Sequence, residues 1–203
     1  IAFVSTSAFA YVNKDFTTQR RLFLKVEADL KKGKMLSYQQ HKQTLVNYPL
    51  FPYLKYEALK ANIHTSTYSE INDFIKTYHD SPLANKLRNE WLKAKASKKL
   101  WSDYLRAYDI NSKNDVEMQC HYINAILQTT NDKEIYKYVP GIWLYGKPLP
   151  KSCDPVFSRW KQDGKLTRNL LWQRIKLAIT NNEPHLAKLL AKELPVQDIK
   201  IIE

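Results

Sequence analysis

Residues 116–127 read VEMQCHYINAIL, and this stretch decides the fold class. Its apolar side chains recur every three or four residues, at Val116, Cys120, Ile123 and Leu127. Because an α-helix has 3.6 residues per turn, this spacing places them on one helix face. The stretch therefore predicts an amphipathic helix that carries a cysteine in its apolar stripe.

The same apolar period continues on both sides of this helix, through most of the chain. No stretch alternates apolar and polar residues as a half-buried strand does. Further stripes are Leu22, Val26 and Leu30; Ile71, Phe74, Ile75 and Tyr78; Leu83, Leu87 and Trp91; Leu100, Trp101, Tyr104, Leu105 and Tyr108; Val156, Phe157 and Trp160; Leu170, Leu171, Arg174, Ile175 and Ala178; and Leu186, Leu189, Leu190 and Leu194.

Capping residues predict where several of these helices begin and end. Residues 67–70, Thr-Tyr-Ser-Glu, have the pattern of a capping box, in which the first and fourth residues satisfy each other's backbone N–H groups. Gly33 and Gly164 stand where two stripes end, the usual place for a glycine after a helix.

Prolines predict further boundaries. In the segment YPLFPYLKY at residues 48–56, Pro49 should stop one helix and Pro52 suits the first turn of the next. We expect its aromatic side chains to pack between the two helices, the alternative being a surface that stacks on sugars or bases. Residues 131–134 can cap a helix that Pro140 should end or kink.

These signals predict about eleven helices of roughly 10–17 residues joined by short turns. Short connections favour antiparallel neighbours, so the chain is expected to form stacked helical hairpins. Each hairpin leaves an apolar face that the next one covers, as in an α-solenoid. No regular 34-residue repeat is visible. The fold class is therefore all-α, an irregular α-solenoid of stacked helical hairpins that forms a curved superhelix, with a compact bundle as the alternative.

The charge of the chain is +12 and is unevenly distributed. Residues 1–100 hold 17 basic and 8 acidic residues, whereas residues 101–203 hold 15 and 12. An excess of this sign favours nucleic acid, anionic lipid or an acidic wall polymer as a partner, and a solvated lysine-rich surface is the alternative. No run approaches the roughly 20 apolar residues of a membrane span, so no transmembrane segment is expected.

The first ten residues, IAFVSTSAFA, predict export. They are small and apolar, and Ala8-Phe9-Ala10 has the A-x-A pattern of a signal-cleavage site. We expect residues 1–10 to be a signal-peptide remnant, with cleavage near Ala10 leaving Tyr11 as the mature start. An ordinary N-terminal segment is the alternative.

The chemistry-bearing side chains form no recognisable active site. The five histidines, His41, His64, His79, His121 and His185, lack metal-ligand spacing, so neither a metal nor a cofactor is expected. Cys120 and His121 are adjacent on a helix and point about 100° apart, which disfavours a nucleophile pair. No carboxylate pair can be placed by spacing.

The two cysteines, Cys120 and Cys153, allow two interpretations. An even count in an exported chain supports a disulfide between neighbouring helices. Two reduced thiols in the core are the alternative.

Several of these segments together resemble one known family. They are NYPLFPYLKYEAL at residues 47–59, Cys-His-Tyr at 120–122, LYGKPLPKSCDPVFSRW at 144–160 with the following Gly164, and RIKLA at 174–178. Over nearly all of residues 14–200 the chain is similar to the N-terminal superhelical region of soluble lytic transglycosylases, periplasmic enzymes that cut peptidoglycan glycan strands.

The resemblance implies a ring or horseshoe of helices, the U-type domain, over residues 11–203, with a disulfide joining Cys120 and Cys153. It also implies that a lysozyme-like domain follows in the full-length parent. That domain uses a catalytic Glu and releases 1,6-anhydromuropeptides. The parent would be a peptidoglycan lyase of murein turnover, whereas this chain would hold no catalytic residue and be inactive alone.

We therefore expect a periplasmic monomer that positions the catalytic domain of its parent and guides glycan strands. Its partners would be peptidoglycan and that C-terminal domain, without cofactor, metal or nucleic acid. The alternatives are a helical-repeat adaptor for another cell-envelope protein and a basic, nucleic-acid-binding helical protein.

Overall fold

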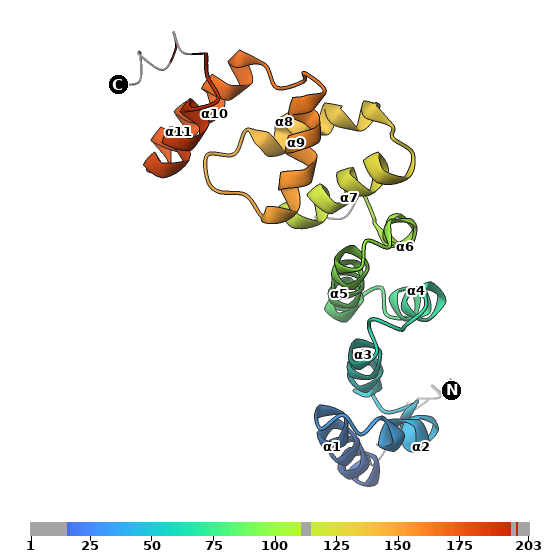
Figure 1. The fold of residues 1–203 in the computed structure, drawn as a ribbon. Helices are drawn as coiled ribbons and strands as arrows, with labels where there is room; N and C mark the ends of the chain where they lie inside the picture. The colour runs from blue at the N-terminus through green and yellow to red at the C-terminus, as the bar shows by residue number, and fades with distance from the viewer. Residues whose placement is uncertain (1–15, 111–114, 196–197, 199–203) are drawn as a thin grey trace, which may run out of the picture.

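The structure is a computed structural model that describes residues 16–110, 115–195 and 198. Within these ranges it contains eleven α-helices, two 3-10 helices and no strand (Figure 1). The proposed signal-peptide remnant lies outside them. The helices are α1 (Thr17–Lys31), α2 (Met35–Leu45), α3 (Phe51–Ala61), α4 (Tyr68–Thr77), α5 (Pro82–Ser97), α6 (Trp101–Ala107), α7 (Val116–Thr129), η1 (Lys133–Tyr138), α8 (Val139–Trp143), η2 (Lys151–Cys153), α9 (Asp154–Gln162), α10 (Arg168–Thr180) and α11 (Pro184–Ala191).

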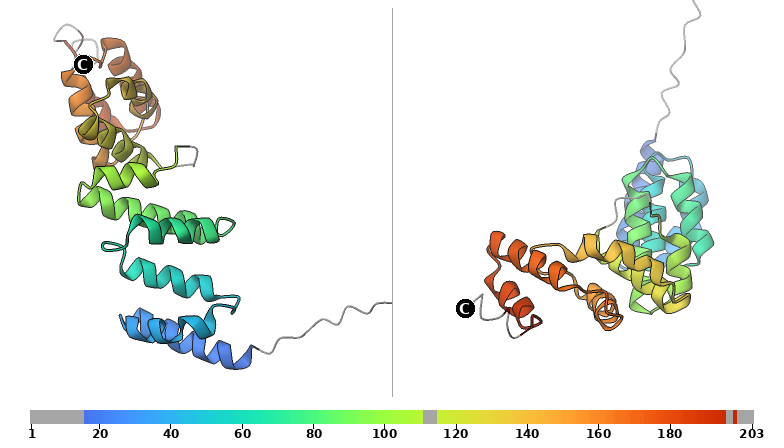
Figure 2. Two further views of the ribbon diagram at one scale, coloured as in Figure 1. Left: turned by 90° about the vertical axis from the view of Figure 1, so that its right-hand side faces the viewer. Right: turned by 90° about the horizontal axis from the view of Figure 1, so that it is seen from above.

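The first seven helices form two rows. Helices α1, α3, α5 and α7 contact one another in succession, and α4 contacts α6 in the second row, which begins with α2. Figures 1 and 2 show α1 to α6 stacked as a column, here called the N-terminal column. Contacts between a helix and the next but one, as α1 makes with α3, α3 with α5, α5 with α7 and α4 with α6, are typical of an α-solenoid, so the predicted fold class is confirmed.

The elements from η1 to α11 form a second part, here called the C-terminal arm. It turns away from the column after α7, which gives the molecule a bent, elongated outline (Figure 1). Helices α10 and α11 pack as a hairpin at its end. This outline excludes the compact bundle. No helix of the described ranges is both long and apolar enough to cross a membrane.

The hydrophobic core is a chain of local clusters, each shared by successive helices. The first joins α1, α2 and α3; the second joins α3, α4 and α5; the third joins α5, α6 and α7; and the fourth fills the C-terminal arm from α7 onward. Each helical hairpin therefore depends on its neighbours for burial of its apolar face.

The predicted capping box is present at the start of α4. The Thr67 hydroxyl accepts a hydrogen bond from the Glu70 backbone N–H at 3.3 Å, and a Glu70 carboxylate oxygen accepts from the Thr67 N–H at 2.8 Å. Gly33 follows α1 with φ +76° and Gly164 follows α9 with φ +68°, a backbone conformation that favours glycine. Both predicted helix ends are confirmed.

The aromatic segment at residues 48–56 packs mainly as predicted. Pro52 lies in the first turn of α3, and Tyr48, Phe51 and Tyr56 are buried. The Tyr48 ring centroid lies 5.3 Å from that of Phe23 in α1. Tyr53 is the exception, being 52% exposed.

The prediction for Pro140 was wrong. Pro140 neither ends nor kinks a single helix, because it lies in the first turn of α8, which runs on to Trp143. Proline suits this position since its missing N–H would have no partner inside the helix. The preceding residues form the 3-10 helix η1 instead, with Asp132 as its cap. Helices α6, α8, α9 and α11 are also shorter than the predicted 10 residues.

The capping box gives a testable stability prediction. Replacing Thr67 with alanine removes one backbone partner and should lower the free energy of unfolding by about 1 kcal/mol, measured by urea denaturation. Thr77 in the same helix bonds back to the Asp73 carbonyl and is the matched control. Thr77→Ala should change stability by less than about 0.5 kcal/mol. An equal loss in both variants would contradict the capping role.

The cap should also depend on pH. Hydrogen bonds from Thr67 lower the pKa of Glu70 in the folded chain. A lowered folded-state pKa means that the stabilisation is present above the unfolded value of about 4.3 and is lost as the pH falls below it. The difference between wild type and Glu70→Gln should therefore shrink on acidification, and a constant difference would count against this linkage.

Candidate functional site around helix α7

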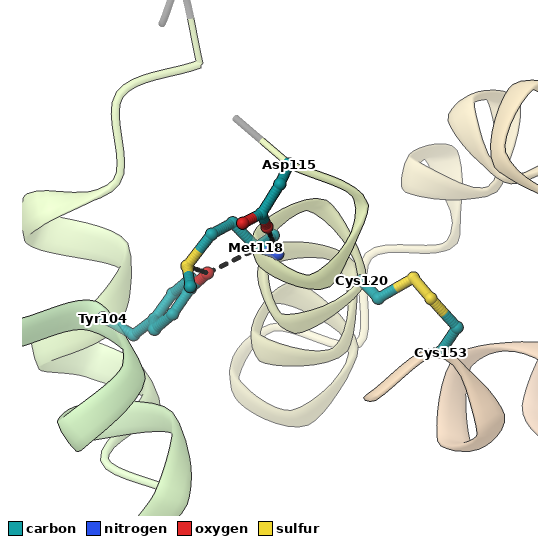
Figure 3. The surroundings of a disulfide bond; sticks show 5 residues. All are labelled: Tyr104, Asp115, Met118, Cys120 and Cys153. Atoms are coloured by element: carbon teal, nitrogen blue, oxygen red, sulfur yellow. Dashed lines mark hydrogen bonds between the residues drawn. A yellow bond between two sulfur atoms is a disulfide. The ribbon is translucent and has the colours of Figure 1, made fainter. Parts of the chain in front are cut away.

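The two cysteines meet on one side of α7. Cys120 lies in this helix and Cys153 ends η2, and the structure joins them in a disulfide with the two Cα atoms 4.9 Å apart (Figure 3). Both residues are fully buried, and 33 positions separate them in the sequence. The bond ties α7 to the start of α9.

The other side of α7 is held by a buried tyrosine. The Tyr104 hydroxyl donates a hydrogen bond to the Met118 carbonyl oxygen at 2.8 Å (Figure 3). Burial raises the pKa of Tyr104, so the hydroxyl stays a donor at neutral pH. Asp115 caps the helix by accepting from the Met118 backbone N–H at 2.9 Å. Helix α7 is therefore fixed on two faces.

A groove opens beside α7, where the column meets the arm. It encloses about 440 Å³ and includes Tyr108, Ile110, Tyr122, Tyr138 and Gly141 in its walls. The rings of Tyr108 and Tyr122 stack with centroids 4.3 Å apart. Tyr138 and Ile110 are about half exposed. An apolar, aromatic concavity of this size is typical of a small-ligand or sugar-sized site.

The histidines lie apart from one another. His121 packs against the rings of Trp101 and Tyr104 in the column, and burial lowers its pKa. Its neighbour Cys120 is held in the disulfide, which leaves no free thiol for a Cys/His pair. In the parts of the chain that the structure describes, no group of three or more His, Cys, Asp or Glu side chains could hold a metal ion.

Several carboxylates make structural hydrogen bonds. Glu90 accepts from the Tyr56 hydroxyl at 2.7 Å, and Asp163 accepts from the Tyr136 hydroxyl at the same distance. Burial and this bond raise the pKa of Tyr136 to about 12, while the bonds to Asp163 lower the pKa of that carboxyl. These groups are suited to holding helices together and poorly suited to proton transfer.

Many lysine side chains of the N-terminal column lie at its surface. Some cations pair with acids of their own helix or turn, as Lys31 does with Glu27 at 3.1 Å. Others are exposed and make no ion pair within the described ranges, namely Lys25, Lys32, Lys42, Lys98 and Lys99. Unpaired, solvated cations of this kind can attract a polyanion over the range of the Debye length.

One family model matches part of the chain. It is described as Cucumovirus coat protein and covers residues 110–198, less than half of the sequence. The curated relatives and the solved structures that match most of the chain are not coat proteins, so this match does not show the family of the chain.

The curated relatives that match the chain are instead named soluble lytic murein transglycosylases. The chain is 27% identical over 177 residues to the soluble lytic murein transglycosylase of Escherichia coli K12, which covers 87% of this chain and 27% of the relative. It is 26% identical to the protein of the same name from Salmonella typhimurium over 88% of the chain and 28% of the relative. The chain therefore spans little more than a quarter of the length of these relatives.

Solved structures agree with these relatives. An inactive mutant of lytic transglycosylase Slt from Pseudomonas aeruginosa matches with a TM-score of 0.78 and 33% identity, over 88% of this chain and 29% of that one. The 70 kDa soluble lytic transglycosylase from Escherichia coli matches with a TM-score of 0.83 and 25% identity, over 93% and 30%.

The architecture defines the chain as an irregular, disulfide-linked α-solenoid. Its relatives then identify it as similar to one region of the soluble lytic transglycosylases, and the resemblance seen in the sequence is confirmed over most of the chain.

The sequence pointed to Cys120 and Cys153 but not to the groove. The structure brings both cysteines together. The tyrosines of the groove come from the end of α6, from α7 and from η1, so no local pattern links them. The high tyrosine content, 13 residues, was the available signal.

The disulfide gives a second prediction. Opening a loop of this length should lower the free energy of unfolding by about 3–4 kcal/mol, because the unfolded chain gains conformational freedom. The double variant Cys120→Ala/Cys153→Ala and the reduced wild type should both show this loss in urea denaturation. A denaturation midpoint that does not respond to reductant would contradict a stabilising disulfide.

Proposed function

We propose that this chain is the non-catalytic superhelical scaffold region of a periplasmic peptidoglycan lytic transglycosylase. The observation that supports it most directly is the match to solved lytic transglycosylases over 88–93% of this chain and about 30% of theirs. In this proposal the full-length parent cleaves the glycan strand, and residues outside this chain supply the catalytic acid.

The local packing supports a positioning role. Each hairpin is buried against its neighbours, and the disulfide ties α7 to η2 at the bend between the column and the arm. An array of this kind can hold an attached domain at a defined place relative to its substrate. A disulfide also suits the oxidising periplasm, which is consistent with the proposed export.

The surface supports a strand-guiding role. Exposed lysines of the column would attract the carboxylates of peptide stems, and the aromatic groove beside α7 offers flat apolar faces to sugar rings. The lysines would then attract the polymer from a distance, and the side chains of the groove would contact its sugar rings directly.

The electrostatic part of the proposal predicts salt-sensitive binding. Retention of the chain on purified sacculi should fall steeply from low salt to about 1 M, where the Debye length is about 3 Å. Lys32→Glu/Lys42→Glu on the column should weaken binding at low salt. Lys188→Glu/Lys192→Glu on α11 and just after it carries the same charge change and should weaken binding less. Retention that does not vary with salt would contradict charge guidance.

The enzymatic part is tested on the full-length parent. Its reaction with sacculi should release 1,6-anhydromuropeptides, detected by mass spectrometry, and the isolated 203-residue chain should release none. Absence of anhydro products from the parent would instead favour a helical-repeat adaptor. Release by the isolated chain would contradict the non-catalytic role.

A further inference from the structure

Arg174 on α10 is the most unusual charged residue of the C-terminal arm. It is 5% exposed, in the middle of the apolar cluster that fills the arm. Its Nε atom is buried and makes no hydrogen bond. Buried charges are normally paired, because transferring them from water is costly. Arg174 therefore lacks the partner that its position calls for.

Two aromatic rings hold the guanidinium in place. Its central carbon lies 4.1 Å from the centroid of the Trp143 ring and 5.7 Å from that of Phe157. The attraction between a cation and the face of an aromatic ring uses none of the five N–H donors of the guanidinium. The side chain is thus held in place, while its buried Nε donor has no hydrogen-bond acceptor.

Arg174 lines a cavity of about 350 Å³. Trp143 and Phe157 form part of its wall, and Leu186 and Leu189 of α11 add apolar surface. A space of this size admits a ligand about as large as an acylated amino acid. Its polar and apolar walls suit a molecule with one charged end.

The other charges around the cavity do not neutralise Arg174. Lys161 and Glu193 bond to each other, with Nζ and Oε1 2.6 Å apart. Asp154 is exposed at the first turn of α9 and makes no ion pair within the described ranges. Burial lowers the pKa of Arg174 to about 10, which still leaves it charged at neutral pH. Glu193 attracts Arg174 electrostatically but is bonded to Lys161, and no ion pair in the described ranges joins it to Arg174. The buried cation therefore has no carboxylate in direct contact.

We propose that this cavity binds a small carboxylate ligand with an adjacent apolar group, and that Arg174 receives the carboxylate. The planar fork of arginine can donate two parallel hydrogen bonds to a carboxylate. Trp143 and Phe157 preset the fork, and the leucines of α11 contact the apolar group. This inference does not depend on the function proposed above.

The test uses N-acetyl-leucine and N-acetyl-leucinamide as matched probes, with binding to the 203-residue chain measured by calorimetry. The two differ in the carboxylate, so the acid should bind at least about tenfold more tightly than the amide. Equal affinity for the two probes, or no binding of the acid up to about 50 mM, overturns the proposal.

Three variants locate the site. Arg174→Met keeps an apolar stem against Trp143 and should abolish the preference for the acid. Lys176→Met, on an exposed position of the same helix, removes the same charge and should leave the preference unchanged. Glu193→Gln releases Lys161 to act as a second cation and should tighten acid binding several-fold.

Other results with these variants would overturn the proposal. A preference for the acid that survives in folded Arg174→Met, or that Lys176→Met abolishes, overturns it. If Arg174→Met does not fold, as judged by circular dichroism, Glu193→Gln decides alone. Unchanged or weaker acid binding in that variant overturns the assignment.

Discussion

The structure depends on burial of α7 from two sides. Met118 and Ala125 are fully buried in the cluster shared with α5 and α6, while Cys120 and Ile123 are buried in the cluster of the C-terminal arm. Most solenoid helices need one apolar stripe, and a helix between two packed neighbours needs two. The hydrogen bond from Tyr104 and the disulfide to Cys153 reinforce these two faces (Figure 3). Helix α7 is therefore the element through which the column and the arm are held together.

The sequence predicted the helical fold because apolar periodicity is a local property. The stripes, the capping box at Thr67 and the two glycine stops all depend on residues within a few positions of each other. The bend at α7 was not predictable in this way. The second buried face of α7 consists of Met118, between the polar Glu117 and Gln119, and the small Ala125, so its period is not evident in the sequence.

Two other features depended on distant partners. Pro140 is compatible with either the end or the beginning of a helix. In the structure the residues before it form η1, and Pro140 lies in the first turn of the next helix, α8. Arg174 stood within an apolar stripe, which was a signal of burial. The groups that surround it, Trp143 and Phe157, lie 31 and 17 positions earlier and were brought to it by the packing of the arm.

The acidic and the basic residues have different roles in this structure. Glu90 and Asp163 fasten neighbouring helices through tyrosine hydroxyls, whereas much of the basic excess of the column faces solvent. A surface that exposes several unpaired lysines, while Glu90 and Asp163 are engaged in structural hydrogen bonds, is suited to contact with an anionic polymer. Chemistry on that polymer is proposed to belong to the rest of the parent protein.

Native-state hydrogen exchange tests the central role of α7 most directly. Ala125→Gly weakens this helix at a position buried against the column. If α7 couples the two parts, exchange should accelerate in α5 and α6 and also in α9 and η2. Ala28→Gly, at an exposed site within α1, should affect α1 and its neighbours alone. Faster exchange on one side of α7 only, in the Ala125→Gly variant, would contradict the account.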